Sequence, residues 1–193
     1  MKLFDELKRA TELLHQHRGQ WALCGGVAAS IYRNKPRFTD DIDFALIDSE
    51  KYPAETLATE VIKKLGYKEY IGFVPDPKID GQQLRGLICA RGTNDERFVG
   101  FDFLLPVQFW VTEAVTVAQS NLIDFGFAKL PTITPESLIL AKLVAATSSP
   151  NRYQDLDDIK EIAASVAIDI DYLKAQIAKH GIQITPSLLQ LVF

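Results

Sequence analysis

The sequence has few of the residues that tie a chain together covalently or hold it in a membrane. Its 193 residues include only two cysteines, which excludes a disulfide framework. Cys24 and Cys89 both lie in apolar runs, and this favours buried thiols. No apolar run approaches the roughly 18 residues that span a bilayer. The first residues include the acids Asp5 and Glu6 and no long apolar run follows them, so they do not form a secretory signal. We therefore expect a cytoplasmic protein without a membrane partner.

Positive charge is also in short supply. The chain carries 21 Lys and Arg residues against 25 Asp and Glu residues, a formal net charge of −4. Generic nucleic-acid binders are basic, so the net charge does not indicate a nucleic-acid partner, and one would need a local basic face. The length suffices for one sizeable core with a small helical appendage.

The expected elements are mixed in the front half of the chain and helical at its end. Apolar periodicity predicts helices at 2–18, 27–32 and 54–65, strands at 21–24, 41–47, 67–73, 84–90 and 98–105, and a hairpin at 122–133. Residues 107–118 fit either a helix or a strand. A helix start at Thr134-Pro135-Glu136 introduces predicted helices at 137–146, 155–166, 170–180 and 186–192. We therefore divide the chain into a core, 1–133, and a helical region, 134–193, packed on it.

A glycine pair marks the turn between the first predicted strand and the helix that follows it. Gly25 and Gly26 follow the apolar run 21–24. Glycines let backbone amides approach a phosphate closely, and a helix N-terminus adds partial positive charge. The same pair at such a turn often has a purely structural role, so it indicates a phosphate site only in combination with other residues.

Three aspartates supply that combination. Asp41 and Asp43 are two apart on a predicted strand, so they share one face about 7 Å apart along the chain and repel each other unless a cation intervenes. Mg²⁺ prefers such oxygen ligands. Asp102 lies between Phe101 and Phe103, where an unpaired carboxylate is costly to bury. Each feature alone also fits a solvated strand edge.

Together the glycines and carboxylates predict one site. The gap between Gly26 and Asp41 holds one short helix and a loop, which would return the chain beside the glycine turn. A phosphate cradle and three acids are typical of phosphoryl or nucleotidyl transfer with two metal ions.

The motifs resemble a known superfamily. Gly25-Gly26-Val27-Ala28-Ala29, followed by Arg37-Phe38-Thr39-Asp40-Asp41-Ile42-Asp43-Phe44, is similar to the signature of the DNA polymerase β-like nucleotidyltransferases, and most of all to its minimal branch with the AbiEii-type toxins. Small antibiotic-modifying nucleotidyltransferases share the pattern. Asp102 matches the later aspartate, and the segment with Lys142, Arg152, Asp155 and Asp158 resembles the helices after the sheet. The resemblance covers about residues 21–160, and Gly26 departs from it because many relatives have serine there.

This resemblance implies a fold, an activity and a set of roles. The fold is a mixed, mostly antiparallel α/β sheet flanked by helices, with residues 1–133 as the catalytic core and a helical C-terminal region. The activity is transfer of a nucleoside monophosphate from an NTP to a hydroxyl of a small molecule, protein or RNA. The catalytic residues, which are also ligands of Mg²⁺ or Mn²⁺, are Asp41, Asp43 and Asp102. The substrate-binding residues are Gly25, Gly26, Arg37, Thr39 and Lys142. A cognate antitoxin-like protein is a further implied partner.

Several supporting residues keep two interpretations. Arg33 and Lys35 either hold the triphosphate or form a solvated basic loop. Lys142 either extends to water along an apolar helix or reaches the phosphates. Arg152, Asp155 and Asp158 are spaced to pair with one another and with Lys142, which favours a mainly structural role.

Other functions that use Asp-x-Asp fit less well. In phosphatases of the haloacid dehalogenase type an apolar strand leads up to the pair, whereas here the apolar residues Phe44 to Ile47 follow it. Glycosyltransferase domains with this motif are usually longer. The remaining alternative is a non-catalytic nucleotide-binding or toxin–antitoxin module of the same fold, which the presence of all three carboxylates disfavours.

Overall fold

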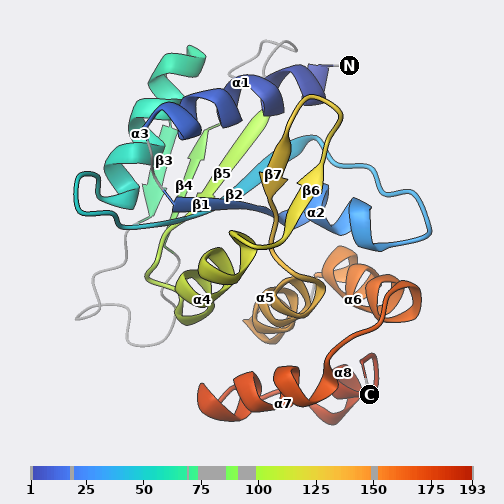
Figure 1. Ribbon diagram of the computed structural model, residues 1–193. Helices are drawn as coiled ribbons and strands as arrows, with labels where there is room; N and C mark the ends of the chain where they lie inside the picture. Colours follow the sequence, from blue (N-terminus) through green and yellow to red (C-terminus); the bar gives the residue numbers. More distant parts are fainter. Residues whose placement is uncertain are drawn as a thin grey trace.

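The described residues form a sheet with helices on both faces, followed by a helical C-terminal region (Figure 1). The computed structural model describes residues 2–17, 20–68, 70–73, 86–90, 99–148 and 152–192. The front part contains α1 (Lys2–Gln16), β1 (Gln20–Cys24), α2 (Gly25–Tyr32), β2 (Asp41–Ile47), α3 (Ala54–Leu65), β3 (Tyr70–Phe73), β4 (Leu87–Ala90), β5 (Gly100–Leu104) and α4 (Phe109–Ala118). A small hairpin, β6 (Leu122–Asp124) and β7 (Lys129–Pro131), leads to α5 (Pro135–Ser148), α6 (Tyr153–Ser165), α7 (Ile170–Lys179) and α8 (Pro186–Leu189).

The main sheet has the strand order β1-β2-β5-β4-β3. Strands β2 and β5 run parallel, whereas the other described neighbours in this sheet are antiparallel. The predicted mixed, mostly antiparallel α/β fold is therefore confirmed. The ambiguous segment 107–118 is a helix, α4, from Phe109 onward, and parts of the predicted strands 67–73, 84–90 and 98–105 lie outside the described residues.

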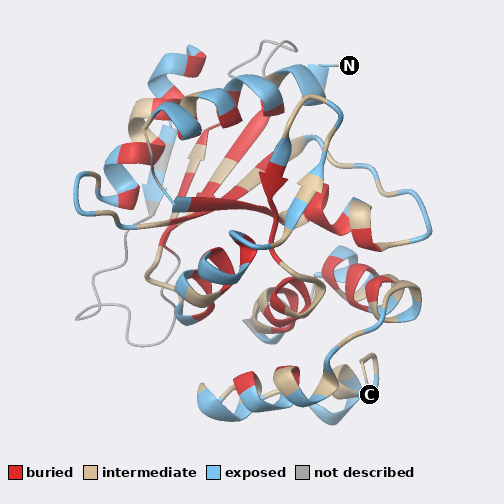
Figure 2. Cartoon of the chain, in the orientation of Figure 1, coloured by how far each residue is buried: buried red, intermediate tan, exposed pale blue. Residues whose placement is uncertain are grey.

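The two faces of the sheet have different side chains because strand residues alternate between them. One face is aromatic: Phe44 of β2 stacks on Phe103 of β5 with ring centroids 5.7 Å apart and on Phe101 at 6.5 Å. Helices α1 and α3 cover this face, and α1 buries Leu7 and Leu14, two turns apart on one stripe. Figure 2 shows buried residues concentrated along the strands and on the helix faces turned toward them.

The opposite face bears small apolar residues and the carboxylates. Ala22 and Ala45 on this face belong to a second buried cluster with residues of α2, α4, α5 and α6. Small side chains let α2 lie close to the sheet, with its first turn directly after β1. Helix α5 packs on α6 and α7 and also contacts α2. The C-terminal helices thus border the face on which Asp41, Asp43 and Asp102 lie.

No helix in the described part of the chain is long and apolar enough to cross a membrane.

Candidate active site

The strand register sets Asp43 and Asp102 side by side. They are paired positions on the parallel strands β2 and β5, and side chains at paired positions point to the same face of a sheet. Cys24 on β1 pairs with Asp43, and Cys89 on β4 pairs with Asp102, so one row crosses four strands as Cys24, Asp43, Asp102 and Cys89. Cys24 is buried as expected, whereas the expectation of a buried thiol is wrong for Cys89, which is half-buried.

Asp41 shares this face because it is two residues before Asp43 on β2. Its Oδ1 accepts a hydrogen bond of 3.0 Å from the Thr39 hydroxyl. Thr39 therefore orients Asp41, and the hydroxyl lies between the carboxylate strand and the glycine turn.

The glycine turn is the start of α2, which begins at Gly25 instead of at Val27 as predicted. Gly25 has a φ of +57°, and a Cβ there would lie 1.9 Å from Asp43 Oδ2. The Gly26 amide donates a hydrogen bond of 3.2 Å to the same oxygen. The first amides of a helix lack intrahelical partners and favour negative charge, so this turn suits a negatively charged group.

Gly26 is a glycine because two side chains occupy the space beside it. A Cβ at this position would lie 2.2 Å from Arg37 Nη1 and 2.5 Å from Thr39 Oγ1. Any side chain at position 26 would therefore have to displace the Arg37 guanidinium and the Thr39 side chain. The Arg37 Nη1 nitrogen is buried and has no hydrogen-bond partner among the described residues. A buried guanidinium donor without a partner beside a helix N-terminus suits an additional anion.

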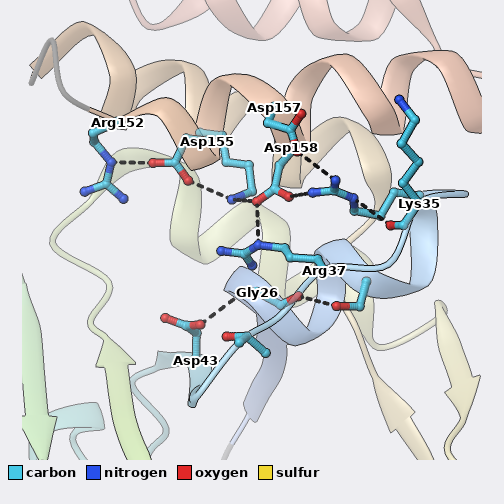
Figure 3. A network of polar contacts seen from close by, with 12 residues as sticks. Gly26, Lys35, Arg37, Asp43, Arg152, Asp155, Asp157 and Asp158 are labelled. Atoms are coloured by element: carbon cyan, nitrogen blue, oxygen red, sulfur yellow. Dashed lines mark hydrogen bonds and ion pairs between the residues drawn. The ribbon is translucent and has the colours of Figure 1, made fainter.

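Arg37 reaches from this turn to the C-terminal helices. Figure 3 shows it between Gly26 of α2 and Asp158 of α6, with Arg37 Nε 3.3 Å from Asp158 Oδ2. Lys142 of α5 forms ion pairs of 2.7 Å with Asp155 and with Asp158. Arg152 pairs with Asp155 as well. Of the predicted pairings, those of Arg152 with Asp155 and of Lys142 with both aspartates are confirmed.

The same network decides between the two interpretations of the basic loop and of Lys142. The Arg33 side chain is 5% exposed and pairs with Asp157 and Asp158, so the solvated-loop interpretation is wrong for it. Lys35 is exposed and pairs with Glu161 of α6. Lys142 is buried, so it does not extend to water; its contact with phosphate stays a prediction. The ion pairs that join Arg33 and Lys35 to α6 were not predicted from the sequence. Their only signal was the acid-rich segment from Asp155 to Glu161.

Asp43 is the carboxyl group of the site whose pKa is raised by its surroundings. Burial, and then the nearby charges of Asp41 and Asp102, raise the pKa of its carboxyl from 3.8 to about 7, against the opposing effects of the Gly26 amide and Lys142. The pKa of the Cys24 thiol is also raised, first by burial and then by Asp43 and Asp102. Like charges at this spacing favour either a shared proton or a bound cation.

The donor set fits a hard divalent cation, although the described residues contain no ready-made group of three His, Cys, Asp or Glu side chains that could hold a metal. Asp43 Oδ2 instead accepts from Gly26, and Asp41 Oδ1 from Thr39. The carboxylates nevertheless share one face, two of them at paired positions, and Mg²⁺ prefers such oxygens. The assignments of Asp41, Asp43 and Asp102 as metal ligands, and of Gly25, Gly26, Arg37 and Thr39 as substrate-binding residues, stay predictions.

A known protein family matches most of the chain. The protein family described as "Nucleotidyl transferase AbiEii toxin, Type IV TA system" matches residues 10–190. No curated protein matches the chain significantly.

Solved structures share the fold. The chain superposes on an antigenic nucleotidyltransferase-like protein from Paracoccidioides brasiliensis with a TM-score of 0.56 and 18% identity, over 99% of this chain and 91% of the other. The solution structure of the antibiotic-resistance factor ANT(2'')-Ia gives a TM-score of 0.60 at 14% identity, covering 94% and 95%. The crystal structure of ANT(2'')-Ia with adenylyl-2''-tobramycin gives 0.62 at 13%, covering 94% and 99%. At these identities the likeness establishes the fold alone.

The raised pKa of Asp43 predicts how the stability of the metal-free protein depends on pH. The folded state holds the proton more tightly than the unfolded state, so this stabilisation is complete below about pH 4 and is lost as the pH rises through about 7. Asp43→Asn should therefore gain about 1 to 4 kcal/mol in unfolding free energy relative to the wild type between pH 5 and 8. Urea unfolding in chelator measures this, with Asp40→Asn, at an exposed neighbouring position, as the control. If the difference in unfolding free energy between Asp43→Asn and the wild type did not change with pH, the raised pKa of Asp43 would be refuted.

The contacts of Gly25 predict that an added methyl group disrupts the site and not only the backbone. Gly25→Ala should lose about 1 to 2 kcal/mol of stability from the positive φ and should also displace Asp43, which a Cβ would overlap. Gly66→Ala is a matched control, because Gly66 has a φ of +95° at the end of α3 with no atom within 4 Å of an added Cβ. Gly66→Ala should lose stability but keep NTP binding, whereas Gly25→Ala should lose at least as much stability and also lose NTP binding. Loss of NTP binding in both variants would contradict this expectation.

Proposed function

The chain belongs to the AbiEii nucleotidyltransferase toxin family, and from this premise we propose that it transfers a nucleoside monophosphate from an NTP to a hydroxyl acceptor with the help of Mg²⁺ or Mn²⁺. The observation that carries the proposal is the paired register of Asp43 and Asp102 beside the glycine start of α2. This juxtaposition sets acidic groups for a cation next to amides for a phosphate.

The anionic triphosphate is held by groups that the chain supplies on the α2 side. The glycine start of α2, whose Gly26 amide donates to Asp43, lies beside Arg37 Nη1, which has no hydrogen-bond partner among the described residues. Thr39 keeps Asp41 oriented, and Lys142 adds positive charge from α5. Hydrogen bonds from fixed donors stabilise charge that develops on transferring phosphoryl groups.

The carboxylates divide the remaining work. Asp41 and Asp43 would hold the divalent cation, and Asp102 would join them from β5. When bound, the cation would neutralise charge on the phosphates and make the α-phosphorus more reactive toward the acceptor oxygen. The acceptor oxygen forms a bond to the α-phosphorus, the bond from that phosphorus to the bridging oxygen breaks, and pyrophosphate leaves. Asp102 accepts the proton of the acceptor hydroxyl, since a carboxylate within reach can act as a general base.

The acceptor and the partner are identified only by class. The acceptor carries a hydroxyl and is a small molecule, a protein or an RNA, of which the net charge of −4 favours RNA least. The family description refers to a type IV toxin–antitoxin system, and we therefore propose a cognate antitoxin as a partner. Incubation with each α-labelled NTP and a cell extract, followed by tracing of the label, identifies the acceptor.

NTP binding should depend on the cation. A triphosphate and a cluster of carboxylates repel each other until a cation intervenes. Calorimetry with ATP, GTP, CTP and UTP should show at least about tenfold weaker binding in chelator than in Mg²⁺ or Mn²⁺. Equal affinities for every nucleotide with chelator and with metal would contradict the site.

The division of roles predicts different losses at two paired positions. Asp102→Asn should abolish transfer yet largely retain metal-dependent NTP binding, because Asp41 and Asp43 remain. Asp43→Asn should lose both. Each variant should stay folded, because removal of one carboxylate relieves like-charge repulsion in the metal-free site. Label transfer and calorimetry measure the two properties separately, and wild-type transfer by Asp102→Asn would show that the assignment of the third acid is wrong.

A further inference from the structure

A buried carboxylate joins the substrate side of the site to the helical region. Asp158 of α6 is 0% exposed. Its Oδ1 accepts from Arg33 Nη1, while its Oδ2 lies 2.7 Å from Lys142 Nζ and 3.3 Å from Arg37 Nε. Two cations proposed to face the phosphates therefore share one oxygen, and Arg33 occupies the other.

Arg33 is held in this position from two sides. Its side chain is 5% exposed, and its Nη2 lies 2.7 Å from Asp157 Oδ2. The guanidinium is planar and presents its donors in a fixed fork. Arg33 thus bridges Asp157 and Asp158, and the Asp158 carboxylate has Oδ1 toward Arg33 and Oδ2 toward Lys142 and Arg37.

Arg33 also lies at the far end of the helix that begins at the glycine turn. It is the C-cap of α2, and a cation is favourable at the C-terminus of a helix. Helix α2 has eight residues, which span about 12 Å. Anchoring of its C-terminus to α6 therefore fixes the direction of the helix whose first amides face Asp43, and the loop that carries Arg37 starts from the same anchor.

We propose that Arg33 is a positioning residue for the NTP, an inference that rests on the proposed nucleotidyl transfer. Arg33 does not touch the substrate. It takes up one oxygen of Asp158 and so limits how strongly Arg37 and Lys142 are drawn onto α6. Without it, both oxygens of a buried carboxylate must be matched by Arg37 and Lys142 alone. Those two cations then move toward α6 and away from Gly26, and the triphosphate loses its donors.

A second tether of the same loop offers a matched control. Lys35 pairs with Glu161, and the backbone amide of Asn34 donates a hydrogen bond of 3.0 Å to Ser165 Oγ. These contacts also fasten the loop to α6, but the Lys35 side chain is 73% exposed and does not contact Asp158. An exposed ion pair contributes little to the stability of the fold. Replacement of Lys35 therefore removes one contact between the loop and α6 while leaving Asp158 and its three cations in place.

The experiment compares Arg33→Met, Arg33→Lys and Lys35→Met in nucleotide binding and label transfer with Mg²⁺. Arg33→Met should raise the KM for the NTP about tenfold or more with kcat within about threefold, since it weakens ground-state binding and leaves the carboxylates in place. Arg33→Lys keeps the charge but cannot bridge both aspartates, so its KM should be intermediate. Lys35→Met should stay within about twofold of the wild type.

Thermal unfolding of each variant separates positioning from folding. A wild-type KM in Arg33→Met, or an equal rise of KM in Lys35→Met, would overturn the proposal. If Arg33→Met does not fold, Arg33→Lys decides: a raised KM supports the role, and an unchanged KM refutes it. Failure of the wild type to bind any NTP would instead refute the proposed function, so the two failures are distinguishable.

Discussion

Repulsion between carboxylates on one face of the sheet is the constraint on which the rest of the site depends. Parallel pairing of β2 and β5 sets Asp43 beside Asp102, and the strand period adds Asp41. The surroundings compensate with the amide of Gly26, the hydroxyl of Thr39 and the charge of Lys142. The compensation is incomplete, as the raised pKa of Asp43 shows, and this leaves a place for a cation and a phosphate.

The C-terminal helices are part of this arrangement because they hold its cations. Arg37, from the loop before β2, lies against Asp158 of α6 (Figure 3), and Lys142 of α5 pairs with the same carboxylate. The helical region thus acts as a frame for the substrate side of the site. A buried ion network of this kind stabilises a fold only weakly but specifies geometry when all its members are present, which suits a site that must align donors.

The local parts of this design could be predicted from residue patterns, whereas the place of Asp102 beside them could be predicted only from the family resemblance, and the contacts of Arg33 could not be predicted at all. Alternation predicts that Asp41 and Asp43 share a face, and the glycine pair predicts the start of α2 to within two residues. The register of Asp43 with Asp102 depends on pairing across 59 positions, which no local pattern encodes. Arg33 lies in a polar segment that is typical of a solvated loop. Its side chain is nevertheless buried, because α6 packs against α2.

The most direct test of the central claim is a titration with Mn²⁺, followed by electron paramagnetic resonance, in the presence of a non-hydrolysable NTP. If Asp41, Asp43 and Asp102 together form a cation site, the wild type with nucleotide should bind a second Mn²⁺ ion that Asp102→Asn does not bind. Equal Mn²⁺ binding in the two proteins, or binding to nucleotide alone without involvement of the protein, would contradict the account.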